Sequence, residues 1–296
     1  MKQFIQFPFT RFVLGAVLVA GTYIGTQQFT NPFLAQFAGQ AIRFPLRLLV
    51  YLSVTALVVG AYALYWRWVE RRPMMELQPQ GAVRDLSKGF FFTLLVASLV
   101  LGPLWLHGNL VIEKVNGWRY LPQNLGLAIM SATAEEIFFR GLLFRLTEEK
   151  LGSAAATAIS ALLFGAAHYA NPGTTFPQAL GIGLEAGLAL SALYMLTRTL
   201  WLCIATHATW NLLSGVLGLP DSGTATYGYF SSRLVGDERL TGGVFGVEAS
   251  WWTIALGIGV GAYLVGIAYR HKKFKRPFWA AASSEPRPYS VEVNGH

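Results

Sequence analysis

Apolar residues dominate this chain in eight long runs, separated by shorter polar stretches. A helix that crosses a bilayer needs about 20 mostly apolar residues, and each run comes close to or exceeds that length. We therefore predict an all-α fold, a polytopic membrane helical bundle of about eight transmembrane helices. The predicted helices cover residues 12–28, 46–66, 89–107, 121–146, 153–171, 177–197, 199–219 and 251–269.

The first run is the shortest, and it follows Lys2 and Arg11 as the hydrophobic part of a signal peptide would. No pattern of small residues typical of a cleavage site follows it, so we interpret it as a membrane helix. The polar stretches between the runs are too short to fold alone, and no repeat is evident. We predict a single transmembrane domain over residues 1–296, with a loop at 220–248 and a short disordered tail at about 277–296.

Composition supports a membrane location, because 53% of the 296 residues are hydrophobic and only 13% are charged. The net charge of +8 comes from Lys and Arg residues that flank the apolar runs, which argues against a nucleic-acid partner. Most of these basic residues fall on the side of the membrane that holds the N-terminus. This bias predicts a multi-pass protein of the cell (plasma) membrane with both termini cytoplasmic.

The fourth run contains three charged residues in the segment SATAEEIFFRGLLF, residues 131–144. A charge near the bilayer centre costs roughly 2.5–3.5 kcal/mol, so such residues usually face a protein-lined cavity. Glu136 and Arg140 are four residues apart, share a helix face and can pair. Glu135 is rotated by about 100° and stays available for chemistry. The structural alternative is an ion pair beside a carboxylic acid that stays protonated.

Two further runs carry polar residues at helical spacing. His168 follows Phe164 by four residues, and Asn211 follows His207 by four. Taken alone, each pair is typical of structural hydrogen bonds between helices. Together with the acids, however, they would supply a base, its orienting partners and donors for an oxyanion, which are the groups that hydrolysis requires.

Other polar residues within or beside the runs receive no catalytic role. Glu185 lies between Gly183 and Gly187, where it can line the same cavity. Cys203, the only cysteine, is one turn before His207; we favour simple packing over a Cys–His nucleophile. Glu248 is interpreted as an acid at a helix N-terminus.

The polar residues of the fourth, fifth and seventh runs resemble the three signatures of the CAAX-protease and bacteriocin-processing family of intramembrane proteases, also called the Abi family. These signatures are E-E-x-x-x-R, F-x-x-x-H and H-x-x-x-N/D. They are met in the family's order by Glu135, Glu136 and Arg140, by Phe164 and His168, and by His207 and Asn211. The resemblance covers about residues 121–215, which would form the catalytic core.

This resemblance implies a glutamate-type intramembrane endopeptidase that needs no cofactor. It implies that Glu135 and His168 activate the attacking water and that His207 and Asn211 stabilise the oxyanion. Glu136 and Arg140 would then hold the geometry of the site. The expected partners are a peptide or a lipidated or membrane protein as substrate, together with membrane lipids.

Three alternatives remain open at this stage. Two His and one Glu could hold zinc in a membrane hydrolase, although no H-E-x-x-H motif is present. Glu, Arg and His could form the relay of a proton-coupled carrier. The chain could also be a non-catalytic immunity or scaffold protein that binds a membrane partner without cleaving it.

Overall fold

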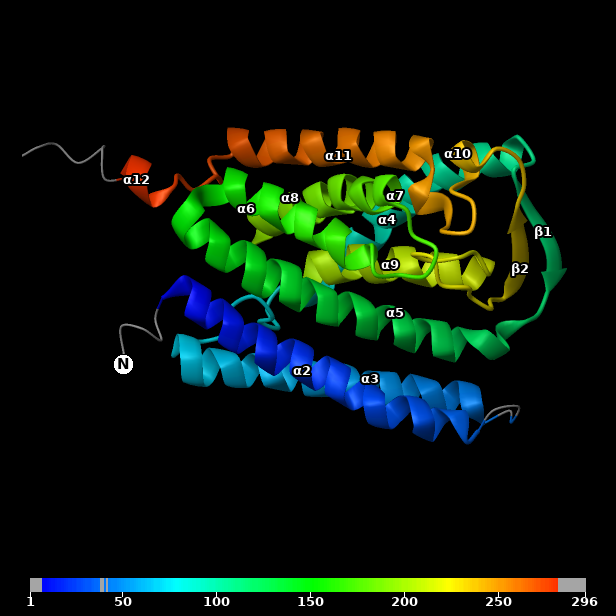
Figure 1. The fold of residues 1–296 in the computed structure, drawn as a ribbon, viewed down its shortest axis with the longest axis horizontal. Helices are drawn as coiled ribbons and strands as arrows, with labels where there is room; N and C mark the ends of the chain where they lie inside the picture. Colours follow the sequence, from blue (N-terminus) through cyan, green and yellow to red (C-terminus); the bar gives the residue numbers. More distant parts are fainter. Residues whose placement is uncertain (1–6, 38–39, 41, 282–296) are drawn as a thin grey trace, which may run out of the picture.

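Long helices that run roughly along one axis make up most of the computed structural model, which describes residues 7–37, 40 and 42–281 (Figure 1). The long elements are α2 (Pro8–Ala35), α3 (Arg43–Tyr65), α4 (Ala82–Leu106), α5 (Leu121–Glu136), α6 (Arg145–His168), α9 (Trp201–Leu217) and α11 (Trp251–Arg270). Helices α7 (Phe176–Ile182) and α8 (Leu188–Thr197) form one further rod, joined by the π-helical turn η4 (Gly183–Gly187). The π-helical segments η1 (Trp66–Glu70) and η3 (Ile137–Phe144) extend α3 and α5.

Six helices in the described part of the chain are long and apolar enough to cross a membrane. The prediction of a multi-pass helical membrane protein is therefore confirmed, whereas the predicted count of eight is not reached. The fourth and fifth predicted helices fall almost entirely within the single range Trp118–His168, but the non-helical backbone of Gly152 (φ 77°, ψ 171°) divides this range into two helices. The seventh predicted helix, α9, has only 17 residues.

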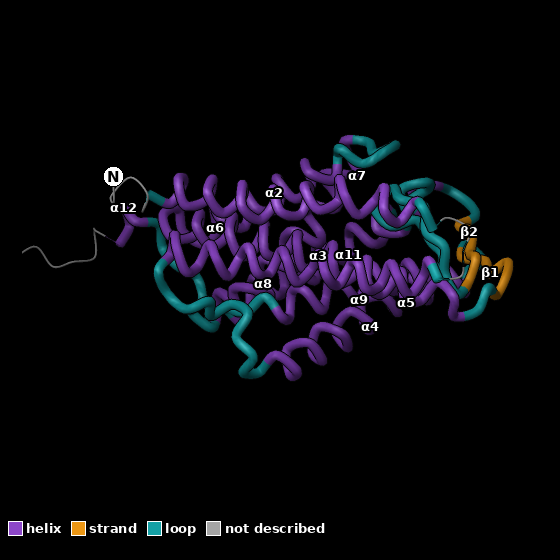
Figure 2. The backbone as a smooth tube through the Cα atoms, turned by 90° about the horizontal axis from the view of Figure 1, so that it is seen from below, coloured by secondary structure: helices purple, strands orange, loops and turns teal. Residues whose placement is uncertain are grey.

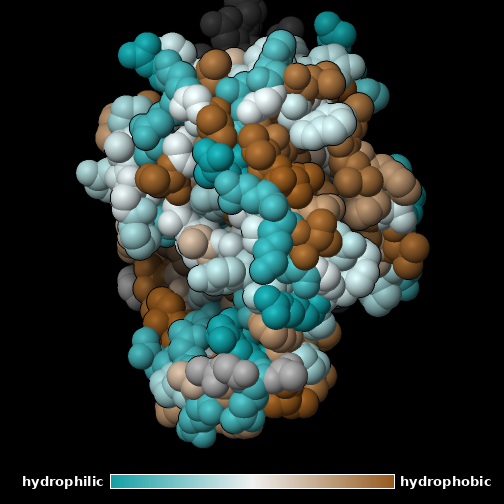
Figure 3. Space-filling model, turned by 90° about the vertical axis from the view of Figure 1, so that its right-hand side faces the viewer, coloured by the Kyte–Doolittle hydropathy of each residue, from teal (hydrophilic) through white to brown (hydrophobic). Residues whose placement is uncertain are grey.

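Loops lie at both ends of the bundle, and the two strands lie together at one of these ends (Figure 2). Strands β1 (Leu110–Val115) and β2 (Phe230–Leu234) pair in an antiparallel manner at one end, with a bulge between Ile112 and Lys114. The surface of this end carries a band of hydrophilic side chains (Figure 3). The purely helical prediction is wrong here, because the two strands come from separate polar stretches and only the folded bundle brings them together.

Short helical elements lie between the long helices or after α11. The turns η2 (Trp118–Tyr120), α10 (Glu238–Thr241) and η5 (Val247–Ala249) lie beside the long helices. Helix α12 (Phe278–Ala281) lies at the start of the tail predicted at about 277–296. The rest of the predicted tail lies outside the described residues.

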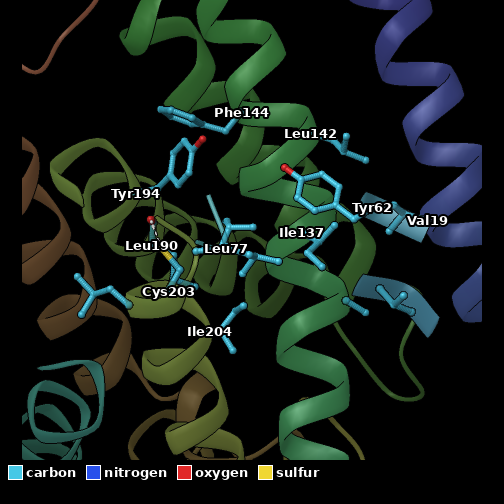
Figure 4. Close-up of a cluster of buried hydrophobic side chains, with 14 of the residues drawn as sticks. Val19, Tyr62, Leu77, Ile137, Leu142, Phe144, Leu190, Tyr194, Cys203 and Ile204 are labelled. Carbon is cyan, nitrogen blue, oxygen red and sulfur yellow. Dashed lines mark hydrogen bonds between the residues drawn. The ribbon is translucent and has the colours of Figure 1, made fainter. Parts of the chain in front are cut away.

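The core lies where α3, α5 with η3, α8 and α9 meet (Figure 4). Tyr62, Phe144 and Tyr194 are almost completely buried, and the Tyr62 hydroxyl donates to the carbonyl oxygen of Gly141 at 3.3 Å. Cys203 is buried and its thiol points to the carbonyl oxygen of Leu190 at 3.5 Å, a packing position. Because lipid is as apolar as these side chains, close packing and hydrogen bonds hold such helices together.

The bend at Gly152 is braced by the segment that follows α11. The Ser153 amide donates to the carbonyl oxygen of Lys275, and the Lys275 amide donates to the Ser153 hydroxyl at 2.9 Å. The buried Glu148 carboxylate pairs with Arg198 and with Lys275. The segment after α11 is thus fastened to the turn at Gly152, between the helix that ends there and the helix that begins there.

Gly152→Ala should destabilise the protein by roughly 1–3 kcal/mol, because the positive φ disfavours any side chain. A Cβ atom at this position would also lie 2.8 Å from the carbonyl oxygen of Lys275. Thermal unfolding in detergent measures the effect. Gly60→Ala is the matched control, since a Cβ there meets nothing within 4 Å. Equal unfolding temperatures for the two variants would contradict the role of the bend.

Candidate active site

The centre of the site is the buried carboxylate of Glu136, at the end of α5. Its Oε1 atom accepts a hydrogen bond from Arg140 Nη1 at 2.9 Å and another from His207 Nδ1 at 2.9 Å. The side chains of Glu136 and Arg140 are completely buried, and that of His207 is 10% exposed. Since an ionised carboxylate only accepts hydrogen bonds, Nδ1 of His207 carries the proton. One oxygen atom thereby joins two helices.

Arg140 extends this network toward two other elements. Its Nη2 donates to the carbonyl oxygens of Ala186 at 3.3 Å and Gly187 at 3.5 Å, both in the π-helical turn η4. Its guanidinium also lies over the ring of Phe164 in α6, 4.8 Å from the ring centre. Turns of π-helix occur frequently at functional sites, and here η3 and η4 meet at Arg140.

Glu135, the neighbouring acid, is placed differently. Its Oε2 atom lies 3.9 Å from His207 Nε2, which is too long for a direct hydrogen bond. Within the described residues this oxygen is buried and has no hydrogen-bond partner, although the side chain as a whole is 31% exposed. The two acids therefore differ in the described part of the chain: Glu136 accepts two hydrogen bonds through Oε1 and leaves only Oε2 without a partner, whereas Glu135 accepts no hydrogen bond from His207 or Arg140.

His207 also lines a cavity of about 130 Å³, whose wall contains residues from α4, α6, α7, η4, α8, α9, α11 and the loop before α11. This volume is well above the roughly 10–15 Å³ that one water needs. Among the six predicted site residues, His168, His207 and Asn211 line the cavity. Glu135, Glu136 and Arg140 reach the site through their contacts with His207 and η4.

His168 and Asn211 have defined partners at the cavity wall. His168 Nδ1 lies 2.8 Å from the carbonyl oxygen of Phe164. A carbonyl can only accept, so Nδ1 holds the proton and Nε2 of the neutral ring keeps a lone pair. Asn211 Nδ2 donates to the hydroxyl of Ser131 at 3.2 Å. The structure brings His207 next to Glu135, whereas the contacts of His168 are with Phe164 and the cavity.

The sequence did not identify the acids that the loop after α9 brings to this cavity. Glu248 accepts from the Ser222 amide and from Trp210 Nε1, so it faces inward and holds the loop, whereas the sequence suggested a helix-terminal acid. Asp221 lies nearby, and Oδ1 of Asp221 is buried with no partner in the described structure. Burial, followed by the negative charge of Glu248, raises the pKa of Asp221 to about 8. Burial likewise raises the pKa of Glu248.

The predicted donor set does not fit zinc. His207 Nδ1 is bound to Glu136, and its Nε2 faces a single oxygen of Glu135. Across the described ranges no three His, Cys, Asp or Glu side chains are grouped as a metal site would require. We therefore derive no step through a metal ion.

Arg140→Leu should destabilise the protein by about 3–5 kcal/mol, because it leaves the buried charge of Glu136 with only His207 as a partner. Unfolding in detergent measures this loss. The control is Arg233→Leu, which removes a pair with Glu113 whose side chains are 59% and 49% exposed; that change should cost less than about 1 kcal/mol. A loss for Arg140→Leu as small as the control's would show that the network does not stabilise the fold.

Asp221→Asn should stabilise the protein in a pH-dependent manner. The folded protein keeps this carboxyl protonated up to about pH 8, whereas an unfolded chain releases the proton near pH 4. Wild-type stability is therefore lost as the pH rises between these values, and Asn avoids that loss. The variant should unfold like wild type below pH 4 and be more stable, on the order of 1 kcal/mol or more, at pH 8. Melting curves at pH 4, 6 and 8 would show no divergence if the carboxyl were ionised normally.

Comparison with known protein families gives a match for the central part of the chain. Residues 117–213 match the family described as type II CAAX prenyl endopeptidase, Rce1-like. This range contains all six predicted site residues. No curated protein and no solved structure matches the chain significantly. Residues 117–213 are thus a domain of the Rce1-like type II CAAX prenyl endopeptidase family, which is a family of glutamate-type intramembrane proteases.

Proposed function

We propose that this protein hydrolyses a peptide bond near the membrane, with water activated by Glu135 and His168 and the oxyanion stabilised by His207 and Asn211. One observation carries the proposal. Of two adjacent acids, Glu136 is bound by Arg140 and His207, while Glu135 points a free buried oxygen at the same imidazole. A structural ion pair would account for Glu136 but not for Glu135.

Glu135 suits the role of general base, because its Oε2 has no competing hydrogen-bond donor. Glu135 Oε2 and His207 Nε2 lie 3.9 Å apart, so one water molecule can contact both atoms from the side. In the reaction Glu135 takes a proton as the water oxygen attacks the carbonyl carbon. It then returns the proton to the amine as the C–N bond breaks. The free lone pair on His168 Nε2 accepts the second hydrogen bond of that water.

Donors for the oxyanion come from α9. Asn211 Nδ2 carries two hydrogens and uses one of them for Ser131, so the second is available. His207 donates through Nε2 when both of its ring nitrogens are protonated, and the carboxylates on its two sides compensate that charge. Glu136 and Arg140 act as positioning residues, because they hold the ring of His207 through Nδ1. Donors held in place before the reaction are the main source of stabilisation in acyl transfer.

The substrate that we infer is a protein or peptide, as the family implies, including a lipidated or membrane-embedded chain. We also propose that the whole chain acts as one transmembrane domain with a catalytic core at about 121–215. In the same proposal it resides in the cell membrane with both termini cytoplasmic. These expectations rest on the sequence pattern of apolar and basic residues.

Glu135→Gln should lower kcat at least about 100-fold while the protein still inserts and melts normally, since general-base catalysis contributes about 10²–10⁴. The assay uses full-length protein in proteoliposomes with a library of membrane-anchored peptides, prenylated and not, read by mass spectrometry. Glu113→Gln, on exposed strand β1, is the control. A fully active Gln variant would remove the proposal, and loss of wild-type cleavage in strong chelator would favour a zinc hydrolase.

A further inference from the structure

Glu185 is a buried acid in the same cavity that the proposed mechanism does not use. It lines the cavity together with His168, His207 and Asn211, and only 7% of the residue is exposed. Its Oε2 atom is fully buried and finds no hydrogen-bond partner among the described residues. Burying an acid without a partner is costly, so such a group usually meets a ligand or partner during function.

The backbone around Glu185 is held tightly on several sides. The carbonyl oxygens of the next two residues, Ala186 and Gly187, accept hydrogen bonds from Arg140. A Cβ atom added at Gly187 would lie 2.6 Å from Ala161 Cα, and one added at Gly257 would lie 2.4 Å from Glu185 Cβ. Helices α6 and α11 therefore clamp the turn η4 from both sides. The position of the carboxylate is consequently fixed relative to the network that holds His207.

The charge of the cavity wall indicates what could meet this acid. The lining contains the carboxylates of Glu185 and Glu248 and neither Lys nor Arg. Both oxygens of Glu248 already accept hydrogen bonds, from Ser222 and Trp210, which leaves Glu185 as the free acceptor. A buried acid with an unpartnered oxygen, in a wall without Lys or Arg, is suited to pair with a cation.

The remaining wall is mostly apolar, with Phe92, Val96, Leu190 and Val260 among its residues. An aliphatic stem that ends in a cationic group complements such a surface with one acid at its end. Lysine and arginine side chains have this form, since their methylene groups bury readily while the head seeks a charged partner.

We propose that Glu185 is a specificity residue that binds the cationic head of a lysine or arginine side chain in the substrate, while the apolar wall holds the stem. The inference rests on the proposed peptidase function and deepens it. The substrate class is a membrane-associated peptide with a basic residue close to the scissile bond.

The test uses the full-length protein and synthetic membrane-anchored peptides in matched sets. Each set places Lys, Gln or Glu at one position from three residues before to three residues after the scissile bond. At one position wild type should cleave the Lys peptide with a kcat/KM at least about tenfold above the Gln peptide, with the Glu peptide poorest. In Glu185→Gln the Lys-to-Gln ratio should fall to about 1, while the control Glu113→Gln keeps the wild-type ratio.

A second measurement separates this inference from the proposed mechanism. In the Glu135→Gln background, binding of the Lys peptide should be at least about tenfold tighter than binding of the Gln peptide. The added change Glu185→Gln should remove that difference without lowering the melting temperature. Wild-type cleavage or binding that is indifferent to Lys at every position would overturn the assignment of Glu185 and leave the role of Glu135 untouched. Full activity of Glu135→Gln would overturn the mechanism instead, and the binding data would still decide on Glu185.

Discussion

The hydrogen bonds that Glu136 Oε1 accepts from Arg140 and His207 are the interaction on which the site depends. This single atom joins the helix of the E-E-x-x-x-R signature to the helix of the H-x-x-x-N signature. Through Arg140 the network reaches η4 and the ring of Phe164, so that four elements meet at one ion pair. A buried pair seldom adds net stability compared with apolar packing, but breaking it is expensive. The same bonds therefore hold both the bundle and the orientation of His207.

Other buried charges of the molecule are paired at the end of the bundle away from the strands. Arg11 binds both Glu70 at 2.6 Å and Glu149 at 2.9 Å, and Arg145 binds Glu70 at 2.7 Å. Among the described residues, buried carboxyl oxygens without a hydrogen-bond partner occur at Glu76 near this end and, closer to His207, at Glu135, Glu136, Glu185 and Asp221. In a medium that cannot hydrate charges such oxygens are costly, and most of them gather around the candidate site.

The loop after α9 completes the cavity wall from outside the helical bundle. Glu248 fastens Ser222 and Trp210 together, and Gly223 donates its amide to the carbonyl oxygen of Phe245. The segment that the sequence suggested as a connector thus contributes Ser222 and Glu248 to the lining of the cavity. The geometry of the candidate site consequently depends on a polar loop as well as on apolar helices.

The sequence alone determined the membrane class and the approximate positions of the long helices, and it predicted six polar residues for the site. These features are local, since apolar run length defines a span and a spacing of four residues places Glu136 beside Arg140 on one face. Tertiary structure decided the rest. It brought Glu135 beside His207, paired β1 with β2, turned the chain at Gly152, and placed Glu248 and Glu185 in the wall of one cavity. Those outcomes depend on contacts between residues far apart in the chain, which no local pattern of hydrophobicity or spacing encodes.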